Sequence, residues 1–362
     1  MKKLWKVLRW VLGALVLYIG GLLLFGTLTD WTPTGEAPAE VWAPTAPTTV
    51  IQDSTVRLIT WNLGYGGLGS EDFFFYNKGD FFWTDIGGVR MTKERIRANV
   101  DGQTSLVGNS AADIYLLQEV DTAARRSHDV NMLAELRDSR LDYATAFAAN
   151  FKSDRVPIPL FQPWDHYGYV TGGLTSLSKY VPETSTRIQL PGEFPWPTKL
   201  FQLDRCALRQ VFRTAGGKDL VVYNVHLSAY DKGGGIRRQQ IEFLREAVLA
   251  DYEQGAYVII GGDWNQLPPG FNWFSLNPTV KKIELPPSIG FDFMPMGWKF
   301  VYDPGVATNR ESDVPYDSHR TRRTLIDYYL VSPNLKIEAV KGLEQSFQHS
   351  DHQPVYLEVS FL

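Results

Sequence analysis

The stretch Gln348-His349-Ser350-Asp351-His352-Gln353-Pro354, near the end of the 362-residue chain, sets an acid directly beside a histidine. A carboxylate next to an imidazole can hold a metal ion or a proton and can polarise a water molecule. A second stretch, residues 323–332 (RTLIDYYLVS), is a strand-like apolar run with Asp327 in its middle. Because a buried carboxylate is costly without a partner, we expect Asp327 to meet a cation or a donor inside the fold.

Other apolar, strand-like stretches also end on a polar side chain. Glycines 261 and 262 end one of these strands, so that the acid and the amide of an Asp-x-Asn pair point to the same side. If the strands belong to one sheet system with aligned ends, these groups converge on a point where a hard cation could bind. In chain order the polar residues are Asn62, Glu119, His226, Asp263, Asn265, Asp327, Asp351 and His352.

Two segments between these strands have helical periodicity. Residues 92–107 begin at Thr92, a good N-cap, and residues 236–250 repeat apolar side chains on one face. Residues 172–180 and 205–212 are predicted to be neighbouring strands joined by a proline-rich excursion.

Composition bounds the class of protein. With 44% hydrophobic and 13% aromatic residues, the chain can bury a large core. The formal charge of −4 becomes −8 when the four basic residues of segment 1–28, which has no acid, are set aside. An acidic soluble part disfavours a broad grip on the phosphates of nucleic acid unless divalent cations intervene. Cys206 is the single cysteine, which excludes an intrachain disulfide and a cysteine-built metal site.

The N-terminus carries a membrane signal. Residues 10–28 are uncharged and apolar, and at about 1.5 Å per residue they nearly span a hydrocarbon core of about 30 Å. The basic residues before them predict a cytoplasmic N-terminus and a globular part outside. The alternative is a secretory signal that is removed. The length of the apolar segment and the lack of a nearby small-x-small site favour an uncleaved anchor.

We expect three units along the chain. Residues 1–30 would form the basic flank and the transmembrane anchor. Residues 31–53, rich in Pro, Ala and Thr, predict an extended linker without helix or strand pairing. Residues 54–362 would form the catalytic domain.

Two loop-like stretches are dense in aromatic residues. Residues 68–90 and 271–298 match neither a helical nor a strand period. They could be surface loops that pack their own aromatic rings, or flaps that touch an apolar substrate or a bilayer. Both alternatives stay open at this point.

Six short motifs together resemble the series found in the endonuclease/exonuclease/phosphatase superfamily, which includes pancreatic-type deoxyribonucleases, neutral sphingomyelinases and inositol-polyphosphate 5-phosphatases. The resemblance runs from about residue 55 to residue 362. It implies a four-layer α/β/β/α sandwich, in which two mixed sheets lie face to face between outer helices and the site lies at one end of the sheets. The motifs, in the order of the family, are Trp61-Asn62, Leu117-Gln118-Glu119, Asn224-Val225-His226-Leu227, Gly262-Asp263-Trp264-Asn265, Ile326-Asp327-Tyr328 and Ser350-Asp351-His352.

The resemblance also implies a metal site. Glu119 would be the main ligand of Mg²⁺, for which Mn²⁺ could substitute, and Asn62 and Asp351 would lie close to the same ion. Such a cation binds a phosphoryl oxygen and offsets the charge that develops in the transition state.

The remaining motif residues are implied to act on water and phosphate. His352, paired with Asp327, would orient or deprotonate the attacking water, and Asp263 would help to position that water. Asn265 would donate to the phosphoryl oxygens. His226 would contact the phosphate and is a candidate proton donor to the leaving oxygen.

The expected activity is hydrolysis of a phosphate ester by direct in-line attack of water. Arg205, beside a motif strand, could neutralise substrate phosphate. The anchor, the acidic soluble part and the aromatic stretches favour a lipid or a small phosphodiester. A nuclease is the alternative, although no basic groove interleaved with aromatic residues is visible. A non-catalytic binding module is a third hypothesis, which the intact motif set disfavours. No protein partner is inferred.

Overall fold

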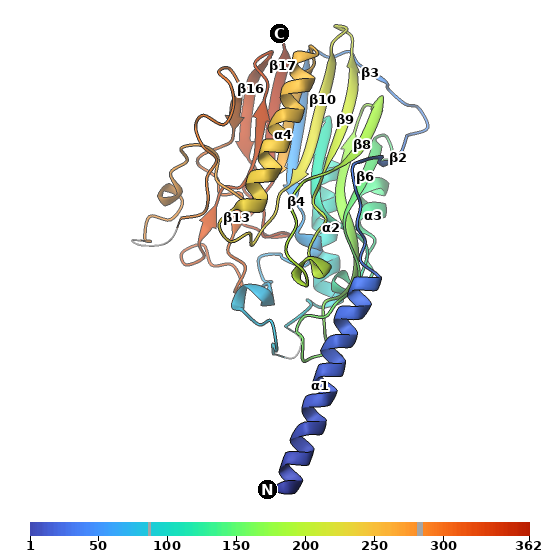
Figure 1. The fold of residues 1–362 in the computed structure, drawn as a ribbon. Helices are drawn as coiled ribbons and strands as arrows, with labels where there is room; N and C mark the ends of the chain where they lie inside the picture. The colour runs from blue at the N-terminus through green and yellow to red at the C-terminus, as the bar shows by residue number, and fades with distance from the viewer. Residues whose placement is uncertain (86–87, 281–284) are drawn as a thin grey trace.

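The computed structural model describes residues 1–85, 88–280 and 285–362, and its main feature is a pair of β-sheets stacked face to face (Figure 1). The first, eight-stranded sheet has the order β1-β8-β9-β10-β11-β15-β12, and β3 pairs with β9. Its strands are β1 (Glu36–Pro38), β3 (Val50–Ile51), β8 (Thr184–Gln189), β9 (Cys206–Thr214), β10 (Asp219–His226), β11 (Tyr257–Asp263), β12 (Lys299–Val301) and β15 (Asp327–Val331).

The second, seven-stranded sheet has the order β16-β17-β4-β5-β7-β6-β2. A separate two-stranded ribbon pairs β13 (Asn309–Arg310) with β14 (Arg323–Thr324). The seven strands are β2 (Glu40–Trp42), β4 (Thr55–Asn62), β5 (Ile114–Ala124), β6 (Ala144–Val156), β7 (Gly168–Ser178), β16 (Leu335–Gly342) and β17 (Val355–Phe361).

Helices cover the outer face of each sheet. Ile241, Leu244 and Val248 of α4 (Gly235–Glu253) pack on the eight-stranded sheet. On the other side, α2 (Lys93–Asn109) and α3 (Met132–Ser139) pack on the seven-stranded sheet. A third apolar cluster fills the space between the sheets. The expected four-layer α/β/β/α sandwich is confirmed (Figure 1).

Burial explains why the central strands are so apolar. Strand β11 is buried along its whole length, because it faces α4 on one side and the opposite sheet on the other. Thr92 caps α2 as predicted, since its hydroxyl accepts a hydrogen bond from the Arg95 amide at 3.3 Å. Short 3-10 turns at Gly64–Gly66, Phe75–Lys78, Arg125–Ser127, Thr198–Phe201 and Trp273–Ser275 complete the described secondary structure.

The expected pairing of residues 172–180 with 205–212 was wrong. β7 lies between β5 and β6 in the seven-stranded sheet, whereas β9 lies between β8 and β10 in the eight-stranded one. The proline-rich excursion between them contains β8, which belongs to the eight-stranded sheet, so the chain passes from one sheet to the other before β8. The hydrophobic pattern of a strand that is buried on both faces does not indicate which sheet the strand joins, so the pattern could not predict that β7 and β9 belong to different sheets.

Strand pairing also occurs where the sequence predicted an unpaired spacer. β1 pairs with β8 at the edge of one sheet, and β2 pairs with β6 at the edge of the other. β3 runs parallel to the end of β9, where it pairs with Arg213 and Thr214. Proline is tolerated at such edges because one side of an edge strand needs no ladder hydrogen bond. Part of segment 31–53 is therefore attached to the sandwich, while the three-unit division of the chain remains a prediction.

The N-terminal helix α1 (Lys2–Leu28) projects away from the sandwich (Figure 1). Its length and apolar composition would allow it to cross a membrane, and a signal sequence would have the same properties. Its last turns contact the domain: a side chain at Gly26 would meet Leu200 and Phe201 at 3.4 Å. Farther down, the Tyr18 hydroxyl donates to the carbonyl of Leu160 at 2.9 Å.

The two aromatic stretches have different environments. Phe74, Phe75, Tyr76, Asn77 and Gly79 line a cleft together with motif residues. In the second stretch, Leu276, Ile289 and Trp298 are buried against the α4 side of the sandwich, and none of its described residues lines that cleft. Residues 86–87 and 281–284 of these stretches lie outside the described residues.

Candidate active site

Strand register brings the polar residues to one end of the sandwich. In the eight-stranded sheet, His226 at the end of β10 lies opposite Asp263 of the parallel β11, and Asp263 lies opposite Asp327 of β15. In the other sheet, Asn62 ends β4, which runs parallel to β5. Parallel neighbours end at the same edge, so the side chains from both sheets meet there.

Close backbone contact fixes the relative position of β10 and β11. Gly262 has a φ of 150°, and a Cβ atom there would lie 2.0 Å from the carbonyl oxygen of Val225. Only glycine allows the backbone this approach, which leaves the next residue, Asp263, facing His226.

Glu119 owes its direction to an irregularity in β5. The pairing of β5 with β7 shifts register between Leu117 and Val120, and Glu119 within this shift has a φ of 55°. A β-bulge re-aims one side chain. Here the Glu119 carboxylate accepts a hydrogen bond from Nδ2 of Asn62 at 3.1 Å, and its side chain remains 22% exposed.

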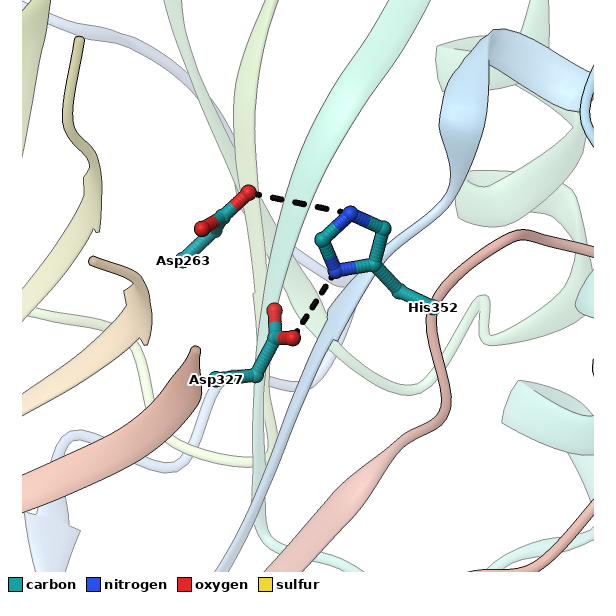
Figure 2. Close-up of side chains that lie close together, drawn as sticks. All are labelled: Asp263, Asp327 and His352. Atoms are coloured by element: carbon teal, nitrogen blue, oxygen red, sulfur yellow. Dashed lines mark hydrogen bonds and ion pairs between the residues drawn. The ribbon is translucent and has the colours of Figure 1, made fainter. Parts of the chain in front are cut away.

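His352 and Asp327 form a buried dyad, as the sequence predicted from the resemblance (Figure 2). Nδ1 of His352 lies 2.8 Å from Oδ2 of Asp327, and Nε2 lies 3.8 Å from Oδ2 of Asp263. Burial would lower the pKa of His352, but the charge and hydrogen bond of Asp327, together with Asp263 and Asp351, raise that pKa to about 10. At that pKa the ring carries a proton at pH 7, so Nε2 can take a proton from water only after the ring has lost that one.

Asp263 lies at the centre of a ring of nitrogen atoms. Its Oδ2 atom is 3.1 Å from Nδ2 of Asn62, 3.4 Å from Nε2 of His226 and 3.8 Å from Nε2 of His352. Its Oδ1 atom accepts a hydrogen bond from the backbone N–H of Asn265 at 2.8 Å. Burial and the charge of Asp327 raise the pKa of Asp263 to about 7. A carboxylate so placed can exchange protons with its neighbours near neutral pH.

His226 and Arg205 lie together on the far side of Asp263. Burial, Arg205 and His352 hold the pKa of His226 well below its usual value, so the ring is neutral at pH 7. Its Nδ1 atom is buried without a hydrogen-bond partner, whereas Nε2 points to the carboxylates of Asp263 and Glu119. Burial also lowers the pKa of Arg205 to about 10, which leaves it charged.

The residues expected at the metal fit a hard cation. Oδ1 of Asp351 is buried without a partner, and burial raises the pKa of this carboxyl to about 6. Asn62 is fully buried, and its Oδ1 atom accepts a hydrogen bond from the backbone N–H of Gly64 at 3.0 Å. Its Nδ2 atom donates to Glu119 and so orients that carboxylate. Glu119 and Asp351 thus offer two carboxylates, and Oδ1 of Asp351 has no hydrogen-bond partner. Carboxylate oxygens are the donors that Mg²⁺ and Mn²⁺ prefer.

A second group has metal-ligand spacing. One ligand atom each from Asp263, Asp327 and His352 lie within 4.8 Å of one another (Figure 2). Nδ1 of His352 is already occupied by Asp327, however. This hydrogen bond favours the dyad interpretation over a metal site at these three residues.

All of these groups except Asn62 and Asp327 line one cleft of about 870 Å³. Asn265 lines the cleft and has a backbone φ of 49°. Its Nδ2 atom donates a hydrogen bond to the carbonyl of Leu227 at 2.9 Å. Arg205, Arg237 and Arg322 also line the cleft. A phosphate group in the cleft would therefore meet carboxylates, imidazoles and guanidinium groups together.

Sequence reasoning missed two contributors. Nδ2 of Asn309 lies 2.9 Å from Nε2 of His352, although Asn309 follows no apolar strand that could have drawn attention to it. Arg126 is buried beside the cleft, paired with Asp121 at 2.7 Å and stacked 4.1 Å from the ring centre of Tyr65. Asp121, five residues before Arg126, was the sequence feature that could have indicated this ion pair, but an acid at that spacing from an arginine is common.

Comparisons with known proteins agree with this fold. The model of the Endonuclease/Exonuclease/phosphatase family matches residues 59–352. A comparison with curated proteins found no match. Three similar solved structures share the fold at low identity. They are the endonuclease/exonuclease/phosphatase from Beutenbergia cavernae DSM 12333 (18% identity, 85% of this chain, 72% of that chain, TM-score 0.53), ANGEL2, a 2′,3′-cyclic phosphatase (14%, 89%, 98%, 0.52), and TDP2 from Caenorhabditis elegans (16%, 85%, 74%, 0.51). Fold, motif order and family match together show that this chain belongs to the endonuclease/exonuclease/phosphatase family.

Proposed function

We propose that the protein is a divalent-metal-dependent hydrolase of phosphate esters, most suited to a lipid or small-molecule phosphodiester. The observation that carries this proposal is the meeting of Glu119, Asp263 and His352 in one cleft, with Asp327 bonded to His352 behind it. These residues come from different strands of both sheets, so their meeting is not a consequence of sequence proximity. Family membership supports hydrolysis of phosphate esters in general.

His352 removes a proton from the attacking water. Asp327 fixes Nδ1 and leaves Nε2 facing Asp263 across 3.8 Å. A water held between Nε2 and the Asp263 carboxylate would be oriented by both groups. The water attacks phosphorus in line with the leaving oxygen, and no covalent intermediate with the protein forms.

Glu119 and Asp351 would hold the cation, with Asn62 positioning Glu119. Mg²⁺, or Mn²⁺ in its place, would polarise a phosphoryl oxygen and offset negative charge in the transition state. Asn265, His226 and Arg205 contact the remaining phosphoryl oxygens.

Burial keeps the His226 ring neutral, which leaves one ring N–H to donate a hydrogen bond. Its role as proton donor to the leaving oxygen stays a prediction.

The walls of the cleft favour an amphipathic substrate. Beside its polar residues, the cleft is lined by apolar side chains that pack on one hydrophobic cluster, namely Phe74, Tyr76, Ile158, Phe201 and Leu203. An apolar wall beside a phosphate site suits a lipid or an aryl ester better than a polynucleotide, whose backbone is charged at every unit. With α1 as an uncleaved anchor, the cytoplasmic end would be Met1 and the cleft would lie outside the membrane.

A nuclease is the second candidate, because the matching family model is named for endonucleases and exonucleases as well as phosphatases. To separate the two, full-length protein in phosphatidylcholine vesicles with Mg²⁺ is given a sphingomyelin-type lipid, an inositol phosphate, plasmid DNA and a bis-aryl phosphate. We expect the lipid or the bis-aryl ester to be cleaved. Plasmid nicking without lipid cleavage would favour the nuclease, and no cleavage of any ester would contradict both.

The anchor is tested separately. Full-length protein should sediment with membranes and resist carbonate extraction, with Met1 still attached when its N-terminus is sequenced. A mature protein that begins after residue 30 and stays soluble would show that the segment is a signal.

A further inference from the structure

Two loops beside α1 hold five aromatic rings out into solvent. Phe82 stacks on Phe161 with ring centres 5.6 Å apart, and Trp83 meets Trp164 edge-on at 5.9 Å. A contiguous exposed apolar patch of this kind is uncommon on a soluble surface and marks an interaction site. This cluster, the aromatic rim, consists of Phe81 (38% exposed), Phe82 (56%), Trp83 (53%), Phe161 (40%) and Trp164 (63%).

The rim is held by a built scaffold. The amides of Leu160 and Phe161 donate to the carbonyls of Phe81 and Phe82, both at 3.0 Å. The fully buried side chain of Gln162 adds two hydrogen bonds to the backbone of the first loop, at 2.8 and 3.0 Å. Because the two loops are tied together, the exposed rings are presented as one surface.

The position of α1 identifies the partner of this surface. Tyr18, which bonds to the carbonyl of Leu160, lies ten residues before the end of the helix at Leu28, or about 15 Å along its axis. Tyr18 is thus inside the apolar segment that would cross a bilayer. If the bilayer surface lies at the level of Tyr18, the rim beside Leu160 lies in its interfacial layer, and residues 19–28 of α1 then stand outside the hydrocarbon core.

We infer that the aromatic rim is a membrane-binding surface that lies in the interfacial layer of the bilayer crossed by α1. This inference rests on the proposal that α1 is retained as an anchor. Aromatic rings with an apolar body favour the level of the lipid head groups. Asp80, which accepts a hydrogen bond from Thr84 at 2.9 Å next to the rim, opposes deeper insertion because a carboxylate is costly in hydrocarbon.

The rim is connected to the cleft by a chain of rings. Phe81 contacts Tyr76 with ring centres 6.5 Å apart, and Tyr76 contacts Tyr230 at 5.7 Å. The Tyr230 hydroxyl also donates to Oδ1 of Asn77 at 2.7 Å. Tyr76, Asn77 and Tyr230 all line the cleft. A rim seated in the head-group layer therefore sets the cleft beside the membrane surface, where a lipid phosphate could enter from the same bilayer.

The chain offers a clean labelling experiment, because its single cysteine, Cys206, is buried. Full-length Phe82→Cys and Trp164→Cys are each labelled with a polarity-sensitive fluorophore and inserted in phosphatidylcholine vesicles. Met296→Cys is the matched control, since Met296 is a fully exposed apolar residue in a segment that Figure 1 shows away from α1. We expect lipid nitroxides to quench the probes at 82 and 164 several-fold more than the control, and iodide to quench them less. Equal access of iodide to all three probes would overturn the inference.

A second readout separates the rim from the chemistry. In the double variant Phe82→Ser/Trp164→Ser, cleavage of lipid in vesicles should fall several-fold, whereas cleavage of a soluble bis-aryl phosphate should stay unchanged. Met296→Ser should alter neither rate. Loss of both activities in the double variant would show damage to the fold and contradict a membrane role. If even the wild type cleaves nothing, the proposed function fails while the quenching result still decides the rim.

Discussion

Oδ2 of Asp327 lies 2.8 Å from Nδ1 of His352, although the two residues are 25 positions apart and belong to different halves of the sandwich. Asp327 begins β15 of the eight-stranded sheet, and His352 precedes β17 of the seven-stranded one. The two sheets must therefore stack correctly before this hydrogen bond can form. Both side chains are buried, and the dyad couples folding of the sandwich to the chemistry of the cleft.

Replacing Asp327 by Asn should abolish most activity while leaving the fold intact. The amide can donate to Nδ1 and so favour the wrong imidazole tautomer, as in other acid-histidine pairs. We expect kcat for the bis-aryl phosphate to fall by roughly a thousandfold or more, with a small change in KM. Asp138→Asn, at an exposed acid on α3, is the control and should behave as wild type. A kcat within a few-fold of wild type would show that Asp327 does not orient His352.

Glu119→Gln should weaken metal binding before any substrate is added. The substitution keeps the shape of the side chain but removes its charge, and hard cations depend on carboxylate charge. Calorimetric titration of Mn²⁺ into full-length protein in detergent should show affinity reduced at least about tenfold. Glu246→Gln, at an exposed position of α4, is the matched control. Unchanged Mn²⁺ affinity in Glu119→Gln would remove Glu119 from the ligand set.

Arg126→Met tests the contribution of the buried ion pair between Arg126 and Asp121 to stability. The substitution leaves the Asp121 carboxylate, itself fully buried, without its partner at 2.7 Å. Breaking such a pair costs about 3–5 kcal/mol of unfolding free energy. Arg213→Met, which removes a half-exposed pair with Asp219, should cost under about 1 kcal/mol. Denaturant unfolding in detergent measures both, and equal effects would contradict the buried role of Arg126.

Asp204 makes stability depend on pH. Burial, assisted by the charge of Asp30 and opposed by Arg187, raises the pKa of Asp204 to about 7. A raised carboxyl pKa means that the folded state binds the proton more tightly, so stability falls as pH rises from about 4 to about 7. Asp204→Asn removes this cost. Its Tm should match wild type near pH 4 and exceed it near pH 8, and a constant difference across that range would contradict the shift.

Much of the site was predictable because its residues follow apolar strands. Asp263 comes directly after a run that is buried on both faces, and His226 and Asp327 occupy equivalent places on neighbouring strands. The resemblance supplied the pairing of Asp327 with His352, which strand pattern alone does not give. Register explains why the prediction succeeds: adjacent strands with aligned ends must bring their terminal side chains together.

The parts that were missed depend on long-range packing. Residues 36–38 and 50–51 form strands only because edges of the finished sheets are available to pair with them. Asn309 reaches His352 through the short β13–β14 ribbon, which has no periodicity of its own. The separation of β7 from β9 into different sheets is likewise fixed by packing. Such contacts have no local pattern, so a single sequence does not carry them.

Hydrolysis of a bis-aryl phosphate by His352→Ala, beside His319→Ala, tests the central proposal most directly. His319 is exposed and carries no contact to the cleft among the described residues, so its variant controls for loss of a histidine. With Mg²⁺ and full-length protein, His319→Ala should retain the wild-type rate. His352→Ala should lose at least about a hundredfold, the usual contribution of a positioned general base. A wild-type rate in His352→Ala would contradict the catalytic role of the dyad.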